Sequence, residues 1–133
     1  MLGVDTNVLV RFLAEDDTIQ TQQARKLFFA RTNQPIYISM LVLAETFTVM
    51  TKLMKFPVGA VLETYGSLLS SPQIRVECPD LVSAALDDAK RTRADFPDAL
   101  IALQNAQAGC AATATFDVRA TRLDGMDAVE VHL

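Results

Sequence analysis

Residues 2–9 read Leu2-Gly3-Val4-Asp5-Thr6-Asn7-Val8-Leu9. The first three of these residues predict a short strand, and a helix is predicted to begin at Asp5-Thr6-Asn7. A residue directly after a strand lies at the carboxyl end of that strand, where parallel sheets form their binding sites. We therefore expect Asp5 to stand at the site-bearing edge of a sheet.

The alternation of strand and helix continues along the chain. Further strands are predicted at residues 36–38, 74–76, 112–115 and, as an edge strand, 129–131. Helices are predicted near residues 18–31, 41–53, 57–69 and 98–108, and one more begins at Pro79. The acidic cluster Glu15-Asp16-Asp17 is expected to cap the first of these helices, and Ser39 the second. Such alternation predicts an α/β fold, a three-layer α/β/α sandwich with a mostly parallel central sheet, in one domain spanning residues 1–133.

The composition excludes several classes of protein. The chain has 133 residues and 50% of them are hydrophobic, which predicts a sizeable core and excludes disorder. No apolar run is long enough to span a bilayer and no signal peptide is evident, so no membrane association is expected. Cys78 and Cys110 have neither metal-ligand spacing nor disulfide density, which predicts reduced core thiols and a cytoplasmic protein. The one histidine, His132, lies next to the C-terminus, which argues against a Ser-His or Cys-His mechanism.

Four carboxylates each stand alone in a charge-free stretch: Asp5, Glu45, Asp98 and Asp117. Their apolar neighbours indicate burial, and a buried carboxylate is costly unless it is protonated, paired or bound to a metal. The 12 basic and 16 acidic residues give a net charge of −4, and setting these four acids aside leaves 12 against 12. The excess negative charge therefore equals the candidate site, and two divalent cations would cancel it.

Carboxylates at one sheet edge, without His or Cys, predict a hard-metal site for Mg²⁺ or Mn²⁺. Such ions activate a water and stabilise charge on a phosphoryl group, so phosphodiester hydrolysis is the natural reaction. Three of the acids, taken alone, also have an ordinary structural interpretation, and Glu45 is harder to explain in this way. Asp5 suits a helix N-cap, Asp98 the positive end of a helix dipole, and Asp117 a turn.

Four motifs occur in order along the chain: Asp5-Thr6-Asn7-Val8-Leu9-Val10-Arg11, Leu43-Ala44-Glu45, Asp95-Phe96-Pro97-Asp98-Ala99-Leu100-Ile101-Ala102 and Thr115-Phe116-Asp117. Together they resemble the PIN-domain proteins and, more narrowly, the VapC-type toxins of toxin–antitoxin pairs. The resemblance covers essentially the whole chain.

This resemblance implies a Mg²⁺- or Mn²⁺-dependent endoribonuclease with RNA as its substrate. It gives Asp5, Glu45, Asp98 and Asp117 both catalytic and metal-binding roles. Asn7 and Thr115 match supporting positions, and Asp95 is either an outer ligand or only the N-cap of its helix. The family also implies a homodimer and a cognate antitoxin, whose C-terminal segment lies in an apolar groove between helices.

Basic residues flank the later acids: Lys90, Arg91 and Arg93 precede Asp98, and Arg119 and Arg122 follow Asp117. They are either solvated surface or a phosphate-binding rim. Two other functions compete with the nuclease. One is a catalytically silent PIN-fold module that binds RNA or protein. The other is a phosphatase or receiver domain, which would need a lysine after the Ala-Thr strand, and none is present.

Overall fold

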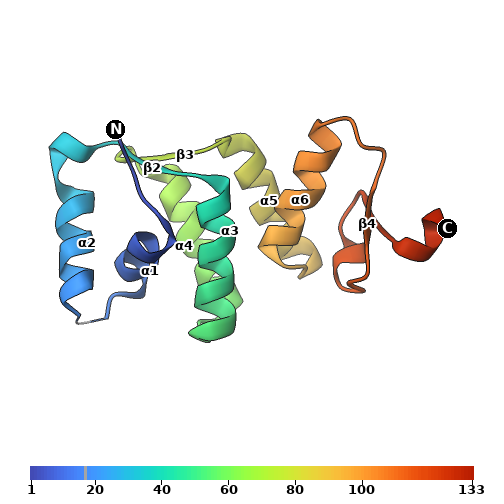
Figure 1. Cartoon of the computed structure of the whole chain (residues 1–133), viewed down its shortest axis with the longest axis horizontal. Coiled ribbons are helices and arrows are strands. Elements are labelled where there is room, and N and C mark those ends of the chain that lie inside the picture. The colour runs from blue at the N-terminus through green and yellow to red at the C-terminus, as the bar shows by residue number, and fades with distance from the viewer. Residues whose placement is uncertain (17) are drawn as a thin grey trace. The chain divides into compact units, whose positions relative to one another are not determined.

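The structure is a computed structural model that describes residues 1–16 and 18–133 (Figure 1). It has an α/β fold with six α-helices in the described residues, and all its strand pairs are parallel. The elements are β1 (Leu2–Gly3), α1 (Thr6–Ala14), α2 (Ile19–Phe29), η1 (Arg31–Asn33), β2 (Ile36–Ile38), α3 (Met40–Thr48), η2 (Val49–Leu53), α4 (Val58–Ser70), β3 (Ile74–Val76), α5 (Pro79–Thr92), α6 (Phe96–Gln107), β4 (Thr113–Thr115), η3 (Ala120–Arg122), β5 (Met126–Ala128) and η4 (Val129–His132).

The chain divides into two compact units, Met1–Pro79 and Asp80–Leu133, here called unit 1 and unit 2. Each unit holds one parallel sheet: β1-β2-β3 in unit 1 and β4-β5 in unit 2. The strand–helix alternation of the sequence therefore produces the parallel pairing that it predicts. Within the described residues, no helix has the length and apolar character needed to cross a membrane.

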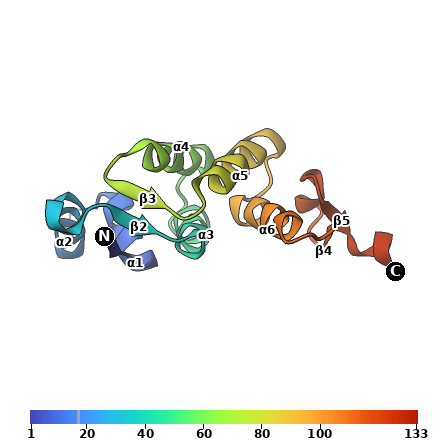
Figure 2. The same ribbon diagram turned by 90° about the horizontal axis from the view of Figure 1, so that it is seen from above.

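Unit 1 is layered around its three-stranded sheet. Figure 2 shows α4 on one side of β2 and β3, and α1 and α3 on the other side. The middle strand, β2, has Ile36 and Ile38 fully buried, as expected for a strand covered on both faces. Its register places Ile38 beside Val76 of β3, and Gly3 of β1 beside Tyr37.

Helix α3 begins where its sequence provides a cap. The Ser39 side chain accepts a hydrogen bond from the Val42 backbone N–H over 3.2 Å, as predicted. A second acceptor comes from a distant part of the chain, because Glu77 Oε1 accepts from the Met40 backbone N–H over 2.8 Å. The predicted helix over 41–53 is present as α3 followed by the π-helical segment η2.

The side chain of Tyr65 is buried in the core of unit 1, and its hydroxyl has a hydrogen-bond partner there. Tyr65 is 1% exposed, and its hydroxyl donates a hydrogen bond to the Leu43 carbonyl over 2.7 Å. Its ring meets Phe47 edge to face with the centroids 6.5 Å apart. Burial raises the pKa of Tyr65 far above its ordinary value, so the phenol stays neutral in the folded protein.

Unit 2 packs α5 and α6 by one apolar face each. The buried residues of α5 are Val82, Ala85, Leu86 and Ala89, which follow the helical period of the sequence. Helix α6 is tied to β4 because Asn105 Nδ2 donates to Thr113 Oγ1 over 2.9 Å. The helix ends at Gln107, and Gly109 then adopts a φ of +99°, the left-handed conformation that glycine tolerates best.

The predicted last strand, 129–131, is wrong. The strand is β5 at Met126–Ala128, which pairs in parallel with β4, and residues 129–132 form the 3₁₀ turn η4. Burial explains the difference, because Met126 is 5% exposed and anchors the strand, whereas Val131 is 68% exposed. The two valines in 129–131 have a high strand propensity. For a strand of three residues, however, the neighbouring strand with which it pairs decides where it forms.

Two further predictions need correction. The second helix ends at Phe29 rather than Arg31, and its cap is the Thr18 side chain, which accepts from the Thr21 N–H. Glu15 and Asp16 therefore do not occupy the cap position, and Asp17, the third acid of the predicted cluster, lies outside the described residues. The cysteines are free, as expected, but Cys78 and Cys110 are both exposed and are not core thiols.

Candidate functional site

Two of the four predicted acids, Asp5 and Glu45, lie in unit 1, at the carboxyl edge of its sheet. Asp5 joins β1 to α1, and its Oδ1 accepts a hydrogen bond from the Val8 N–H over 3.2 Å. Glu45 lies on α3, the helix that follows β2. Because β1 and β2 are parallel neighbours, α1 and α3 both begin at the same sheet edge. The Thr6 hydroxyl joins them by donating a hydrogen bond to Glu45 Oε2 over 3.4 Å.

The other two acids lie in unit 2. Asp98 is the third residue of α6, in the acidic first turn of that helix, and is half-buried. Asp117 follows β4 by two residues and is exposed. Its carboxylate closes a turn, because Oδ1 accepts from the Arg119 N–H over 2.9 Å and from the Ala120 N–H over 3.4 Å.

The prediction that these carboxylates are buried is wrong for three of them, since Asp5, Glu45 and Asp117 are exposed. The helical period explains the case of Glu45. Its apolar neighbours Leu43 and Phe47 point into the core at 1% exposure each, while position 45 falls on the opposite side of the helix. Apolar neighbours in the sequence therefore indicate that the opposite helix face is buried, and they do not indicate burial of the acid itself.

The ordinary structural roles of Asp5 and Asp117 are both present. Asp5 caps α1, and Asp117 stabilises its turn. Both roles use Oδ1, and Oδ2 of neither residue makes a hydrogen bond to the described part of the chain. A capping carboxylate can therefore present its second oxygen to a cation without giving up the cap.

The residues predicted to support the acids take distinct positions. The Thr115 hydroxyl accepts a hydrogen bond from the Asp117 backbone N–H over 3.0 Å, so it shapes the turn that holds that acid. Asn7 is exposed in the first turn of α1. Asp95 occupies the N-cap position of α6, with its side chain making no capping hydrogen bond.

The donor set suits Mg²⁺ or Mn²⁺ by chemistry, because it consists of carboxylate oxygens. Within residues 1–16 and 18–133, Asp5, Glu45 and Asp117 form no ion pair with Lys or Arg, so no internal cation neutralises them. Among the same residues, no group of three or more His, Cys, Asp or Glu side chains is arranged to hold a metal. Two of the four acids lie in unit 1 and two in unit 2.

The two basic segments that the sequence separates are brought together in unit 2. Arg122 Nη1, from η3, donates to the Thr92 carbonyl at the end of α5 over 3.4 Å. Arg91, also at the end of α5, lies 4.0 Å from Asp124 Oδ2 and 3.2 Å from Asp88 Oδ1. Lys90, Arg93 and Arg119 form no ion pair with the described residues. All five Lys and Arg residues of unit 2 belong to these two segments, which we call the basic patch (Lys90, Arg91, Arg93, Arg119 and Arg122).

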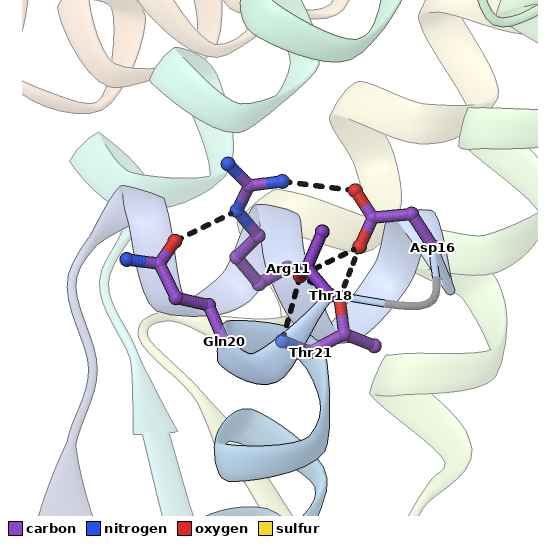
Figure 3. A network of polar contacts seen from close by, with 5 residues as sticks. All are labelled: Arg11, Asp16, Thr18, Gln20 and Thr21. Carbon is purple, nitrogen blue, oxygen red and sulfur yellow. Dashed lines mark hydrogen bonds and ion pairs between the residues drawn. The ribbon is translucent and has the colours of Figure 1, made fainter.

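A polar network that the sequence did not reveal links α1 to the beginning of α2 (Figure 3). Arg11 donates from Nη1 to Asp16 Oδ2 over 2.9 Å and from Nε to Gln20 Oε1 over 3.1 Å. The hydroxyls of Thr18 and Thr21 both donate to Asp16 Oδ1. The Thr21 hydroxyl is the largest cause that lowers the pKa of Asp16, with Thr18 and Arg11 adding to it against the effect of desolvation.

Beside this network lies a cavity of about 290 Å³ between α1 and α2. Its wall is apolar at Val8, Ala24 and Leu27. Its remaining lining residues are polar: Asn7, Arg11, Gln20 and Gln23. Two consecutive helices form this cavity where they pack against each other, and no local sequence signal indicates it.

The chain matches a family model described as the PIN domain over residues 3–126. A search of curated proteins returned no match. The matched range contains all four acids and the strand β4, which precedes Asp117, and it begins within β1, at Gly3.

Proposed function

Because this chain belongs to the PIN-domain family, whose members are mostly nucleases that use divalent metals, we propose that it is a metal-dependent endoribonuclease. The reaction is hydrolysis of RNA phosphodiester bonds. The observation that carries the proposal is the position of Asp5 and Glu45, two exposed carboxylates at one sheet edge, where Thr6, the neighbour of Asp5, donates a hydrogen bond to Glu45. If the two acids had only a structural role, a Lys or Arg partner would stabilise their negative charges more than this arrangement does.

Asp5, Glu45, Asp98 and Asp117 are proposed as the residues that hold Mg²⁺ or Mn²⁺. When bound, the ion activates a water and stabilises the charge that develops on the phosphoryl group. The protein's own contribution is the fixed position of its oxygens. The cap to Val8 N–H holds the Asp5 carboxylate, and the turn from Thr115 to Ala120 holds that of Asp117.

We further propose that the enzyme is a VapC-type toxin that acts in the cytoplasm as a homodimer and is blocked by an antitoxin. The cavity between α1 and α2 supports this proposal, because it combines an apolar wall with a polar rim that includes Asn7, two residues from Asp5. Such a groove suits an amphipathic peptide segment. A basic side chain from that segment would neutralise nearby carboxylates in place of a metal.

The alternative is a catalytically silent PIN-fold module that binds RNA or protein. A cleavage assay separates the two functions. The purified chain is incubated with total cellular RNA and Mg²⁺ or Mn²⁺, beside Asp98→Asn and the control Asp87→Asn, an exposed acid of α5. We expect cleavage by the wild type and by Asp87→Asn, and loss of cleavage in Asp98→Asn. RNA that stays intact with the wild type in either metal would favour the silent module.

A further inference from the structure

An exposed aromatic side chain stands directly beside one of the proposed metal ligands. Phe116 is 86% exposed and precedes Asp117, and Val118 on the other side is 83% exposed. Leaving a phenyl ring in water forfeits the free energy that its burial would contribute. Phe47 and Phe96, in contrast, are fully buried in their units. Phe116 and Val118 therefore present an uncovered apolar surface on both sides of Asp117.

The turn that carries Phe116 is held by its own hydrogen bonds. The Asp117 N–H donates to Thr115 Oγ1, and the Asp117 carboxylate accepts from two backbone N–H groups further on. The Thr121 hydroxyl donates to the Val118 carbonyl over 2.6 Å and completes the turn. Phe116 is thus presented to solvent by a fixed loop, which lowers the entropy lost when a ligand stacks on it.

Cations lie in the same segment. Arg119 is three residues after Phe116 and forms no ion pair within the described part of the chain. Arg122 joins this segment to the end of α5, which carries the rest of the basic patch. All five Lys and Arg residues of unit 2 lie in these two segments, and Lys90, Arg93 and Arg119, which form no ion pair with the described residues, suit a polyanion.

We propose that Phe116 is a stacking platform for an unpaired RNA base, with Arg119 and the basic patch binding the adjoining phosphates. An aromatic ring beside a tract of cations is the combination that binds single-stranded nucleic acid. A base within a duplex is already stacked and hides its face, so this site selects single-stranded RNA. The proposal rests on the proposed ribonuclease function and specifies its substrate. Phe116 acts as a positioning residue, because it holds one base of the RNA strand that is to be cut.

The test uses the full chain and short RNA oligonucleotides, single-stranded or annealed to a complement. The sequence contains no tryptophan, so Phe116→Trp introduces the chain's one tryptophan at the proposed platform, and its emission can be excited apart from that of the two tyrosines. Affinity is measured in the cleavage-deficient Asp98→Asn background, and KM and kcat are measured with Mg²⁺ in the otherwise wild-type chain. Val118→Ala is the matched control, because it shortens an equally exposed side chain on the same turn.

We expect Phe116→Ala to raise the Kd for single-stranded RNA about tenfold, which corresponds to about 1.4 kcal/mol of stacking free energy. KM should rise with it while kcat changes little. Phe116→Trp should keep wild-type affinity, and its fluorescence should be quenched by single-stranded RNA but not by the duplex. Val118→Ala should bind within about twofold of the wild type.

Several results would overturn the proposal. Equal losses in Phe116→Ala and Val118→Ala would indicate a general effect on the turn. Binding without quenching of Phe116→Trp would place the RNA elsewhere. A shift from dimer to monomer in Phe116→Ala, with an unchanged Kd, would show that a second copy covers the ring. Cleavage by the wild type with unchanged Phe116→Ala kinetics rejects this inference alone, whereas a wild type that neither binds nor cleaves RNA rejects the proposed function as well.

Discussion

The hydroxyl of Thr6 donates a hydrogen bond to Oε2 of Glu45 over 3.4 Å, joining residues that are 39 positions apart in the sequence. The contact fixes the beginning of α1 against the flank of α3. It also orients one oxygen of a carboxylate that has no cationic partner in the described residues. Thr6 lies next to Asp5, so this single contact relates the two acids of unit 1 to each other.

Replacing Asp5 separates its structural role from its catalytic one. Asparagine keeps Oδ1 and is as good an N-cap as aspartate, so Asp5→Asn should fold with wild-type stability. It removes the charge, and RNA cleavage should fall by orders of magnitude. Asp5→Ala should lose cleavage and also about 0.5–2 kcal/mol of stability, because the Val8 N–H loses its acceptor. Urea unfolding and a cleavage assay on the three proteins test this, and a fully active Asp5→Asn protein would remove Asp5 from the site.

Metal binding should stabilise the folded chain. A ligand that binds only the folded state adds about 2.7 kcal/mol at a hundred times its dissociation constant. Mg²⁺ or Mn²⁺ should therefore raise the melting temperature of the wild type and of Asp87→Asn, and the rise should be much smaller in Asp98→Asn. Differential scanning calorimetry across a metal titration measures the effect. If the rise were the same in all three proteins, the ion would be binding away from Asp98.

The cavity between α1 and α2 offers a test of the antitoxin proposal. Expression of the chain alone should arrest growth, and co-expression of the small gene adjacent to its own should rescue it. Gln23→Trp places a large ring at the cavity, so the protein should stay toxic in the presence of the antitoxin. Gln22→Trp is the control, because Gln22 is an exposed neighbour on α2 that does not line the cavity. Rescue of both variants would place the antitoxin elsewhere.

The network around Asp16 predicts a stability change with pH. Hydrogen bonds from Thr21 above all lower the folded-state pKa of Asp16 below its ordinary 3.8. A group whose folded pKa is lowered stabilises the fold above its unfolded pKa, and this contribution is lost as the pH falls through the folded value. The free energy of unfolding of the wild type should therefore exceed that of Asp16→Asn at neutral pH. The difference should shrink below about pH 4.

The control for this measurement is Asp87→Asn, because Asp87 has no comparable set of hydrogen bonds in the described residues. Its stability should follow the wild-type pH dependence throughout the acid range. A difference between wild type and Asp16→Asn that persists unchanged down to pH 2 would contradict the lowered pKa and leave only a packing effect.

Most elements could be predicted because their signals are local. An N-cap needs only a side chain and the amide two or three residues later, which is why Ser39 and the start of α1 are confirmed. The buried face of α5 follows from its apolar period in the same way. The joint role of the four acids stays a prediction. It is based on their order and spacing in the sequence, and the family match supports it.

What the sequence by itself determined is therefore the alternation of strands and helices, the caps of α1 and α3, and the parallel pairing. Only the tertiary structure decided which short segment pairs as β5, which face of α3 leaves Glu45 in water, and that Arg122 meets the end of α5. The physical reason is the range of the interactions. Caps and periods depend on neighbours within one turn, whereas exposure and pairing depend on residues that folding brings together from distant positions.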